Sequence, residues 1–348
     1  MARAAPGRVD PGRPDETVLA ARHATLRFAV AVSLAFVVCE AMTWRPTFLA
    51  PLLAGVLLVN LPGRPPFKVG AMLVVAMALA ALFSWLLSTL LQHAPVVLFG
   101  AISVCLFVLF LTMLTGGPAL PAILGLVCLS TVPIVAMAYP TEAGRLPLAL
   151  VRGIALAMLA IWLVYAVWPR SLPRRAAPPP AAPPAPIATA LAATAVVVPM
   201  MLVFLLFAPT QAMAVLIGTV LLVANFDLQR SQQDAVRRVL ANAAGGVTGQ
   251  GAYWVLLMGP SLLTLGLILF ALGIVIGARF ARGDPNAAAL TVGCNAMLII
   301  LSSAIAAGPG DPGQWMTRVM QFALAGLFAV GAMQLVWHRT KPAARQPG

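Results

Sequence analysis

Only a few charged side chains fall inside the long apolar runs of this sequence, and these are the residues that could do chemistry. Glu40 is the only acidic residue inside a run, and Arg152 and Arg318 each stand near the start of the last run of one half of the chain. A charge in the middle of a bilayer costs about 2.5–3.5 kcal/mol on insertion scales, so such residues are usually functional or paired. One carboxylate and two guanidinium groups are thus the main candidates for a functional role within the apolar runs.

Each of these three groups has two interpretations. Glu40 could be a proton-coupling carboxylate, or it could reach the membrane surface and pair with Arg45. Arg152 and Arg318 could attract an anionic substrate, because guanidinium groups bind carboxylates well. They could also extend to the interface or pair with acidic residues of the loops. The hypotheses kept here are Glu40 as a proton-coupling residue and the two arginines as substrate-binding residues.

The other reactive residue types form no catalytic or metal-binding pattern. The four cysteines lie in apolar runs without a CxxC spacing, which indicates small hydrophobic side chains and neither a disulfide nor a metal site. The three histidines are scattered, and the sequence has neither an HExxH motif nor a GxxxxGK[ST] loop. We therefore expect no enzyme, no cofactor, no metal and no ATP-driven activity in this chain.

The composition is that of an integral membrane protein. Of the 348 residues, 61% are hydrophobic and 9% are charged, whereas soluble proteins carry about 25% charged residues. The formal net charge of +13 could suggest a nucleic-acid partner. The basic residues, however, stand in short clusters between apolar runs, which is how membrane proteins fix their orientation. We expect the lipid bilayer as partner, and no nucleic acid.

Twelve apolar runs predict transmembrane or membrane-embedded helices. A helix that crosses about 30 Å of hydrocarbon needs about 20 apolar residues, and it satisfies its own backbone hydrogen bonds. The predicted helices are residues 26–42, 48–61, 70–91, 96–114, 119–138, 148–168, 188–207, 211–224, 239–258, 262–278, 287–307 and 315–337. The predicted fold class is therefore an all-α polytopic membrane protein with about twelve transmembrane helices.

A proline-rich segment divides the chain into two membrane units. Residues 169–187 are predicted to be a semi-rigid cytoplasmic linker, because proline cannot continue a helix and favours extended backbone. Residues 26–168 and 188–338 are predicted six-helix repeats, residues 1–25 a disordered cytoplasmic tail and residues 339–348 a cytoplasmic C-terminal tail. Eighteen of the 22 basic residues fall in segments that this topology places in the cytoplasm, and four fall outside.

The two halves also share sequence. Residues 46–55 (PTFLAPLLAG) align without gaps on residues 209–218 (PTQAMAVLIG), with four identities, and both runs are short for a spanning helix. Six helices per half predict two tandem repeats of the same orientation. Short segments at corresponding positions are typical of a transporter's binding site, although a locally thin bilayer would also accommodate them. The candidate substrate-binding residues are therefore Pro46, Thr47, Asn60, Pro209, Thr210 and Asn225, with Arg152 and Arg318.

Two further stretches carry a resemblance to a known superfamily, namely residues 26–35 (LRFAVAVSLA) and residues 237–249 (RRVLANAAGGVTG). In these stretches and in the short helix that follows the first, the chain resembles the fusaric acid resistance and aromatic acid exporter superfamily of bacterial inner-membrane proteins. The resemblance is to a short branch without a large cytoplasmic domain, and it covers most of residues 22–338. It implies efflux of aromatic or other organic acids, often alongside a periplasmic membrane-fusion adaptor protein.

The expected function is thus efflux of small organic acids, aromatic ones above all, or of related toxic compounds across the bacterial inner membrane. Both termini are expected in the cytoplasm, and a proton gradient is the coupling left by elimination. A passive organic-anion channel is the first alternative, and a non-transporting membrane scaffold or assembly partner is the second. A homo-oligomer is compatible with all three.

Overall fold

The computed structural model describes residues 14–61, 63–138, 144–171, 186–207, 232–284, 286–308 and 331. These residues form ten α-helices and no strand. Eight of the ten helices are long and apolar enough to cross a membrane. The described part of the chain is therefore all-helical, and it is consistent with a polytopic α-helical membrane protein.

Ten of the twelve predicted helices are confirmed as helices. They are α1 (Pro14–Ala41), α2 (Leu49–Asn60), α3 (Phe67–Leu91), α4 (Pro95–Leu114), α5 (Ala119–Ala138), α6 (Arg145–Val167), α7 (Pro186–Phe207), α9 (Gln232–Met258), α10 (Leu262–Ala281) and α11 (Ala287–Ala307). The predicted helix 211–224 lies outside the described residues, and so does 315–337 apart from Gly331. Most of the linker, residues 1–13 of the N-terminal tail and the whole predicted C-terminal tail also lie outside them.

Two helices begin well before their predicted starts. The first begins at Pro14 and not at residue 26, and α9 begins at Gln232 and not at residue 239. Both extensions contain polar residues that favour helix, such as Glu16 and Arg22 in the first. Hydropathy marks only the part of a helix that is apolar, so a helix that continues into polar sequence is predicted too short.

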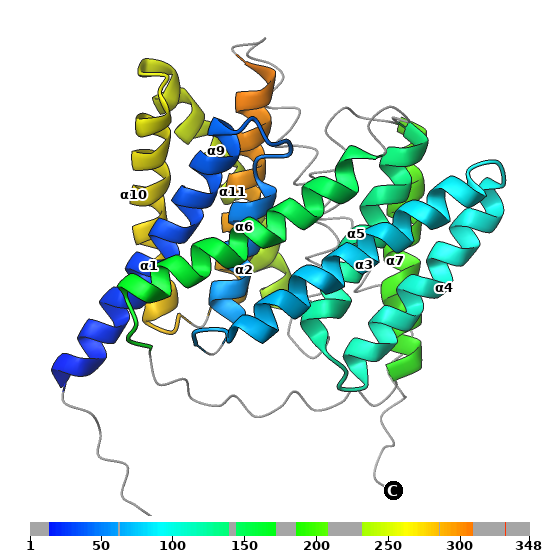
Figure 1. Cartoon of the computed structure of the whole chain (residues 1–348), viewed down its shortest axis with the longest axis horizontal. Coiled ribbons are helices and arrows are strands. Elements are labelled where there is room, and N and C mark those ends of the chain that lie inside the picture. Colours follow the sequence, from blue (N-terminus) through cyan, green and yellow to red (C-terminus); the bar gives the residue numbers. More distant parts are fainter. Residues whose placement is uncertain are drawn as a thin grey trace, which may run out of the picture.

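The helices form two groups that are joined by α2 and α6 (Figure 1). In one group α1 packs along α10 and α9 packs along α11, and in the other α3 packs along α5 and α4 packs along α7. Helix α2 contacts α1, α6 and α11, while α6 contacts α1, α2, α3 and α5. Segments from the two halves of the chain therefore interlock, since α1 lies against α10 and α4 lies against α7.

Helix α2 lies inside the bundle and is too short to cross a bilayer. Its 12 residues correspond to a length of about 18 Å. Its first nine residues are all buried, and Phe28 of α1 lies 3.6 Å from where a Cβ on Gly55 would be. The prediction of a short second helix is thus confirmed, and the structure shows that its neighbours shield it from the surroundings.

The tightest helix pair, α9 with α11, depends on glycine. A Cβ added to Gly245 would collide with the carbonyl oxygen of Gly293, and a Cβ on Gly249 would lie 2.5 Å from the carbonyl oxygen of Met297. Gly293 in turn faces the carbonyl oxygen of Ala241. Small residues at four-residue spacing let two backbones approach each other, which is a common way to join helices in a membrane.

Close packing on glycine also joins α1 of the first half of the chain to α10 of the second half. A Cβ on Gly273 would lie 2.7 Å from the Cα of Ala29, and a Cβ on Gly277 would lie 3.0 Å from the carbonyl oxygen of Thr25. Beside this contact the rings of Phe28 and Phe280 meet at a centroid distance of 5.2 Å. The α1–α10 contact is therefore built for close packing along its length.

The outer surface of the described helices is strongly apolar. Large hydrophobic side chains are exposed along several helices, for example Leu79 on α3 (63%), Val104 on α4 (63%) and Val275 on α10 (60%). Lipid tails are as apolar as these side chains, so a bilayer removes the cost of exposing them to water. This surface is the expected one for helices that face lipid.

Replacing Gly245 by alanine should destabilise the protein. The added methyl group collides with backbone, and overpacking of this kind costs about 1–3 kcal/mol. Gly251 on the same helix has open space around its Cβ position, so Gly251→Ala is the matched control. Thermal unfolding of the protein in detergent should show a lower Tm for Gly245→Ala and an unchanged or slightly higher Tm for the control. Equal Tm values would contradict the packing described.

Candidate functional site

A reversal of the chain after α1 builds the candidate site. The backbone N–H of Trp44 donates to the carbonyl oxygen of Cys39 at 2.8 Å, which turns residues 42–48 back against the end of α1. The turn places Trp44 and Pro46 next to the first turns of α6, where Ala149 and Arg152 lie. Elements from three places in the sequence, α1, α2 and α6, thus meet at one end of the bundle.

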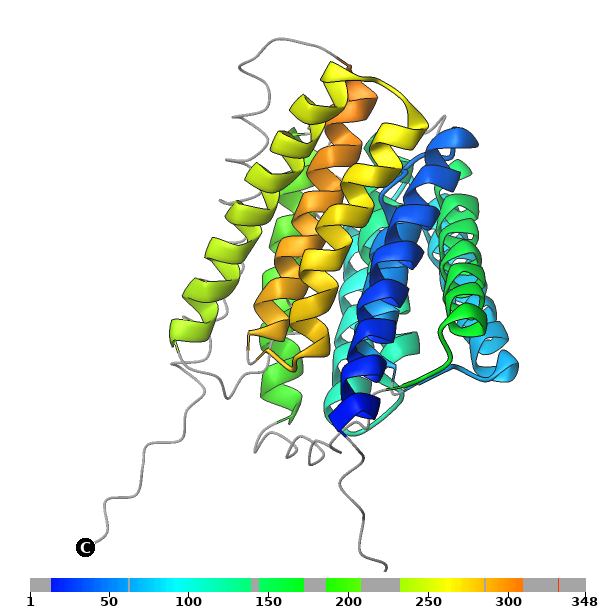
Figure 2. The ribbon, with the colours of Figure 1, turned by 90° about the vertical axis from the view of Figure 1, so that its left-hand side faces the viewer.

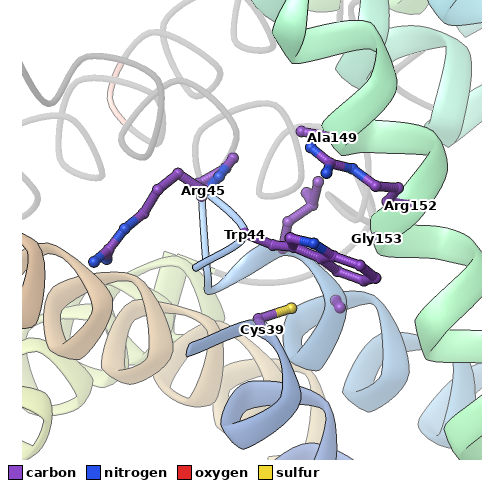
Figure 3. A pocket seen from close by; sticks show the side chains of 9 residues that line it. Cys39, Trp44, Arg45, Ala149, Arg152 and Gly153 are labelled. Atoms are coloured by element: carbon purple, nitrogen blue, oxygen red, sulfur yellow. The ribbon is translucent and has the colours of Figure 1, made fainter. Parts of the chain in front are cut away.

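These elements enclose a small pocket of about 10 Å³, which is room for about one water molecule, and part of it is open (Figure 3). Cys39 contributes to it from α1, Leu49 and Ala50 from α2, and the turn between these helices contributes Trp44, Arg45 and Pro46. Ala149, Arg152 and Gly153 close it from α6. The pocket therefore brings together two of the predicted site residues, Pro46 and Arg152.

Two arginines line the pocket, and Arg152 is the one without an ion-pair partner among the described residues, since Arg45 pairs with Glu40. Its Cζ lies 5.2 Å from the centroid of the Trp44 ring, within the range of a cation–π contact. Its Nε is buried and has no hydrogen-bond partner. Among the described residues the structure shows one ion pair, and it does not include Arg152. The guanidinium group is thus stabilised by an aromatic face and lacks a carboxylate from the described part of the chain.

That one ion pair joins Glu40 to Arg45. The Arg45 Nη2 lies 3.4 Å from the Glu40 Oε1, and Figure 3 shows the Arg45 side chain directed away from Arg152. The Glu40 side chain is 15% exposed, and its second oxygen, Oε2, is buried without a partner. The pairing of Glu40 with Arg45 that the sequence suggested is present. The proton-coupling role stays a hypothesis, with one free carboxylate oxygen as its structural basis.

Thr47 makes a contact between the two halves of the chain. It is fully buried, and its Oγ1 lies 2.6 Å from the Oγ of Ser302 on α11. Ser302 is itself 4% exposed, so both hydroxyl groups are removed from solvent. Thr47 therefore anchors the turn to α11 in this structure, next to the pocket and not on its wall.

The remaining predicted site residues are not brought to the pocket by the described structure. Asn60 lies at the far end of α2, about 18 Å along the helix from the turn, and its Nδ2 donates to the carbonyl oxygen of Val56 at 2.8 Å. Four other candidates lie outside the described residues, so their roles stay predictions: Pro209, Thr210, Asn225 and Arg318.

Sequence reasoning missed Cys39 and Trp44 as pocket residues. Trp44 stands just after the end of α1, where amphipathic aromatic side chains are common because they suit the membrane–water interface. That position could have drawn attention to it. Cys39 looks like any small apolar residue of a helix, and only the fold brings it to the pocket. No group of three or more histidine, cysteine, aspartate or glutamate residues lies together in the described part of the chain.

A family model described as "Protein of unknown function (DUF2955)" matches residues 24–164 of the chain. No curated protein and no solved structure matches it. The matched stretch runs from within α1 into α6, so it contains every residue that lines the pocket and ends before the proline-rich segment. The match gives no activity, and the resemblance to the aromatic acid exporters is not among these findings.

Thr47→Val and Ser302→Ala should each lower the Tm. Either substitution leaves the other hydroxyl buried without a partner, which costs about 1–3 kcal/mol. The double variant should lose less than the sum of the two single variants, because the orphaned group is then gone as well. Thermal unfolding in detergent measures this cycle, with Thr89→Val on the exposed side of α3 as control. Strict additivity would show that the two hydroxyl groups do not interact.

Proposed function

We propose that this protein is an efflux transporter of small organic acids, aromatic ones in particular, in the bacterial inner membrane. The observation that carries the proposal is Arg152, a cation on a candidate membrane-spanning helix that lines a pocket without an acidic partner among the described residues. Keeping such a charge in an apolar bundle is costly, so membrane proteins retain it mainly where it acts on a charged ligand. A carboxylate is the simplest ligand that would complete this site.

The pocket also favours an acid that carries a planar apolar group. Trp44 presents an aromatic ring beside Arg152, and the aliphatic side chains of Leu49 and Ala50 line the wall. The pocket must widen to admit an aromatic acid, and a ring held against Trp44 would then keep its carboxylate within reach of the guanidinium group. An arginine without an ion-pair partner beside an apolar, aromatic wall agrees with the resemblance of the sequence to the aromatic acid exporters.

The proposed architecture is two tandem six-helix repeats of the same orientation, twelve membrane helices in all. In such a chain α1 corresponds to α7, α3 to α9, α4 to α10 and α5 to α11. The pairs α1–α10 and α7–α4 are then equivalent, as are α3–α5 and α9–α11, and all four pairs pack closely. In Figure 2, α1, α9 and α11 run upward and α10 runs downward, as alternating spans in equally oriented repeats would. These features support the duplication.

The proposed topology places both termini and the proline-rich linker in the cytoplasm. The balance of basic residues supports it, because arginine and lysine concentrate at one end of the described helices, where Arg64, Lys68 and Arg170 lie. The turn with Trp44 lies at the opposite end of α1 and α2, so the pocket would open toward the periplasm. An exporter needs such a site where the substrate leaves.

Three further parts of the proposal concern energy and partners. Transport would be coupled to protons, with the free Oε2 of Glu40 as the candidate proton acceptor. A periplasmic membrane-fusion adaptor could receive the substrate at the pocket end. A second copy of the chain could pack against the exposed apolar helices, which would form a homo-oligomer.

Arg152→Gln should lower the transport of benzoate into or out of proteoliposomes at least about tenfold, because it removes a charge-assisted contact worth about 1.5–3 kcal/mol. The matched control is Arg145→Gln, which removes the same charge from an exposed position of the same helix. Equal flux in the two variants would contradict the role of Arg152. Accumulation against a gradient that collapses with a protonophore supports a pump, passive equilibration indicates a channel, and no flux indicates a scaffold.

The topology can be tested by cysteine labelling of intact cells. Thr43 and Ser171 are exposed and lie at opposite ends of the described helices. Thr43→Cys should react with a membrane-impermeant thiol reagent in intact cells, and Ser171→Cys only after the membrane is permeabilised. Three of the native cysteines are buried, so the unsubstituted protein provides the background. The reverse labelling pattern would overturn the proposed orientation.

A further inference from the structure

Helix α9 has an unusual distribution of polar and apolar residues. It is a 27-residue helix within a bundle of apolar spans, yet it is not among the eight helices apolar enough to cross a membrane. Its exposed side chains include large apolar ones, such as Leu240 (62%), Val247 (58%) and Trp254 (50%), beside the polar Arg237 and Thr248. Its buried residues include Gln250 and Tyr253. The helix thus carries two polar side chains on its buried side, among glycine, alanine and leucine residues.

The glycine contacts fix the height of this polar side in the bundle. Gly245 meets Gly293 and Gly249 meets Met297, so α9 and α11 run parallel with a constant offset. The same offset places Tyr253 at the level of Leu301, one residue from Ser302. Since Ser302 bonds Thr47 beside the pocket, Tyr253 lies at nearly the depth of the candidate site, and Gln250 lies about one turn further from that end.

Gln250 and Tyr253 carry polar atoms with no partner. Gln250 is 4% exposed and Tyr253 is 8% exposed, and both the Gln250 Oε1 and the Tyr253 Oη are buried without a hydrogen bond to any described residue. The two residues are three positions apart, so they stand on neighbouring turns of one side of α9. A buried polar atom without a partner costs about 1–3 kcal/mol, and two adjacent ones are unusual in a membrane helix. Side chains three positions apart are neighbours on a helix surface, so one ligand group can reach both.

We infer that Gln250 and Tyr253 form a binding site for an uncharged group that both donates and accepts a hydrogen bond. The amide oxygen of Gln250 accepts, and the hydroxyl of Tyr253 donates. A protonated carboxyl group offers the complementary pair, an O–H and a C=O, and a carboxamide does the same. A carboxylate anion only accepts, so it would need the Gln250 amide to turn its Nε2 inward, and it would also have to lose its hydration in an apolar interior.

This inference rests on the proposed function and deepens it. Where Arg152 would bind the acid as its anion, Gln250 and Tyr253 would bind the same acid in its neutral, protonated form inside the bundle. A neutral acid is far cheaper than a carboxylate in an apolar interior, because no ion has to lose its hydration. Uptake of the acid at this site as the protonated species would carry the proton and the substrate together.

Benzamide is the probe for the site, because it is a neutral analogue of benzoic acid with both a donor and an acceptor. It should raise the Tm of the wild-type protein in detergent in a concentration-dependent way. Tyr253→Phe and Gln250→Leu should each weaken this apparent affinity about tenfold, the effect of one lost hydrogen bond. Tyr165→Phe, which removes the hydroxyl of a buried tyrosine on α6, is the matched control and should bind as the wild type does.

The stability of the unliganded variants provides a second readout. Tyr253→Phe should leave the Tm unchanged or higher, because it removes a buried hydroxyl that has no partner. A clear fall of the Tm would mean that this hydroxyl is a structural hydrogen-bonding group, and it would overturn the inference. So would the absence of a benzamide effect on the wild type, or an equal effect on wild type and both variants.

The two proposals can fail separately. If benzamide binds as expected but the protein transports no benzoate in proteoliposomes, the binding site is supported and the transport function is contradicted. If Arg152→Gln abolishes benzoate flux while Tyr253→Phe and Gln250→Leu leave it unchanged, the transport function is supported and the binding site on α9 is contradicted. Loss of flux in all three variants, with Tyr165→Phe active, supports both.

Discussion

A polar atom without a partner is the most costly feature that a bundle of apolar helices can contain. Within hydrocarbon or a packed helical core there is no water to complete a hydrogen bond, so each buried donor or acceptor must find one inside the protein. Helices answer this requirement for the backbone. Among the described residues, a few side chains have a buried polar atom without a hydrogen bond, and they include Arg152, Glu40, Gln250 and Tyr253. They are therefore informative about function.

Arg27 shows how the same constraint is met when an arginine has a structural role. It is 4% exposed, and its Nη1 donates to the carbonyl oxygens of Trp168, at 2.7 Å, and of Arg170. Its Cζ also lies 4.4 Å from the ring centroid of Tyr165. The carbonyls at the end of α6 carry partial negative charge, so they compensate the cation without any acid. Arg27 fastens α1 to the end of α6.

Arg152 shares with Arg27 only the contact with an aromatic ring. Both arginines lie beside an aromatic ring, but Arg152 has no pair of carbonyl acceptors, and its Nε is left unbonded. The chain thus gives Arg27 two main-chain acceptors just after the end of α6, whereas Arg152 on the same helix has no hydrogen-bond partner among the described residues and lies next to a pocket. The contrast between Arg27 and Arg152 is the physical reason to assign a ligand to the second and not to the first.

Much of the fold follows from hydropathy, whereas the site does not. The ten described helices coincide with predicted ones because a run of apolar residues leaves no cheaper conformation in lipid, and α2 is as short as its sequence suggests. Hydropathy does not predict which helices pack against each other. The α9–α11 contact depends on Gly245 and Gly293 approaching each other, and nothing local shows which glycine meets which. Trp44 joins Arg152 only because the chain reverses after α1.

The contacts between the halves bear on how a path through the bundle could open. The α1–α10 contact is close-packed on glycine, and Thr47 binds Ser302, so the pocket turn of the first half is held by helices of the second. A movement of one half against the other must therefore change the surroundings of Thr47 and of the pocket at the same time. The polar side of α9 would move with α11, to which it is fixed by backbone contact. The same movement would then change the pocket of Arg152 and the site of Gln250 and Tyr253 together, because the two sites lie on opposite sides of the interface between the halves.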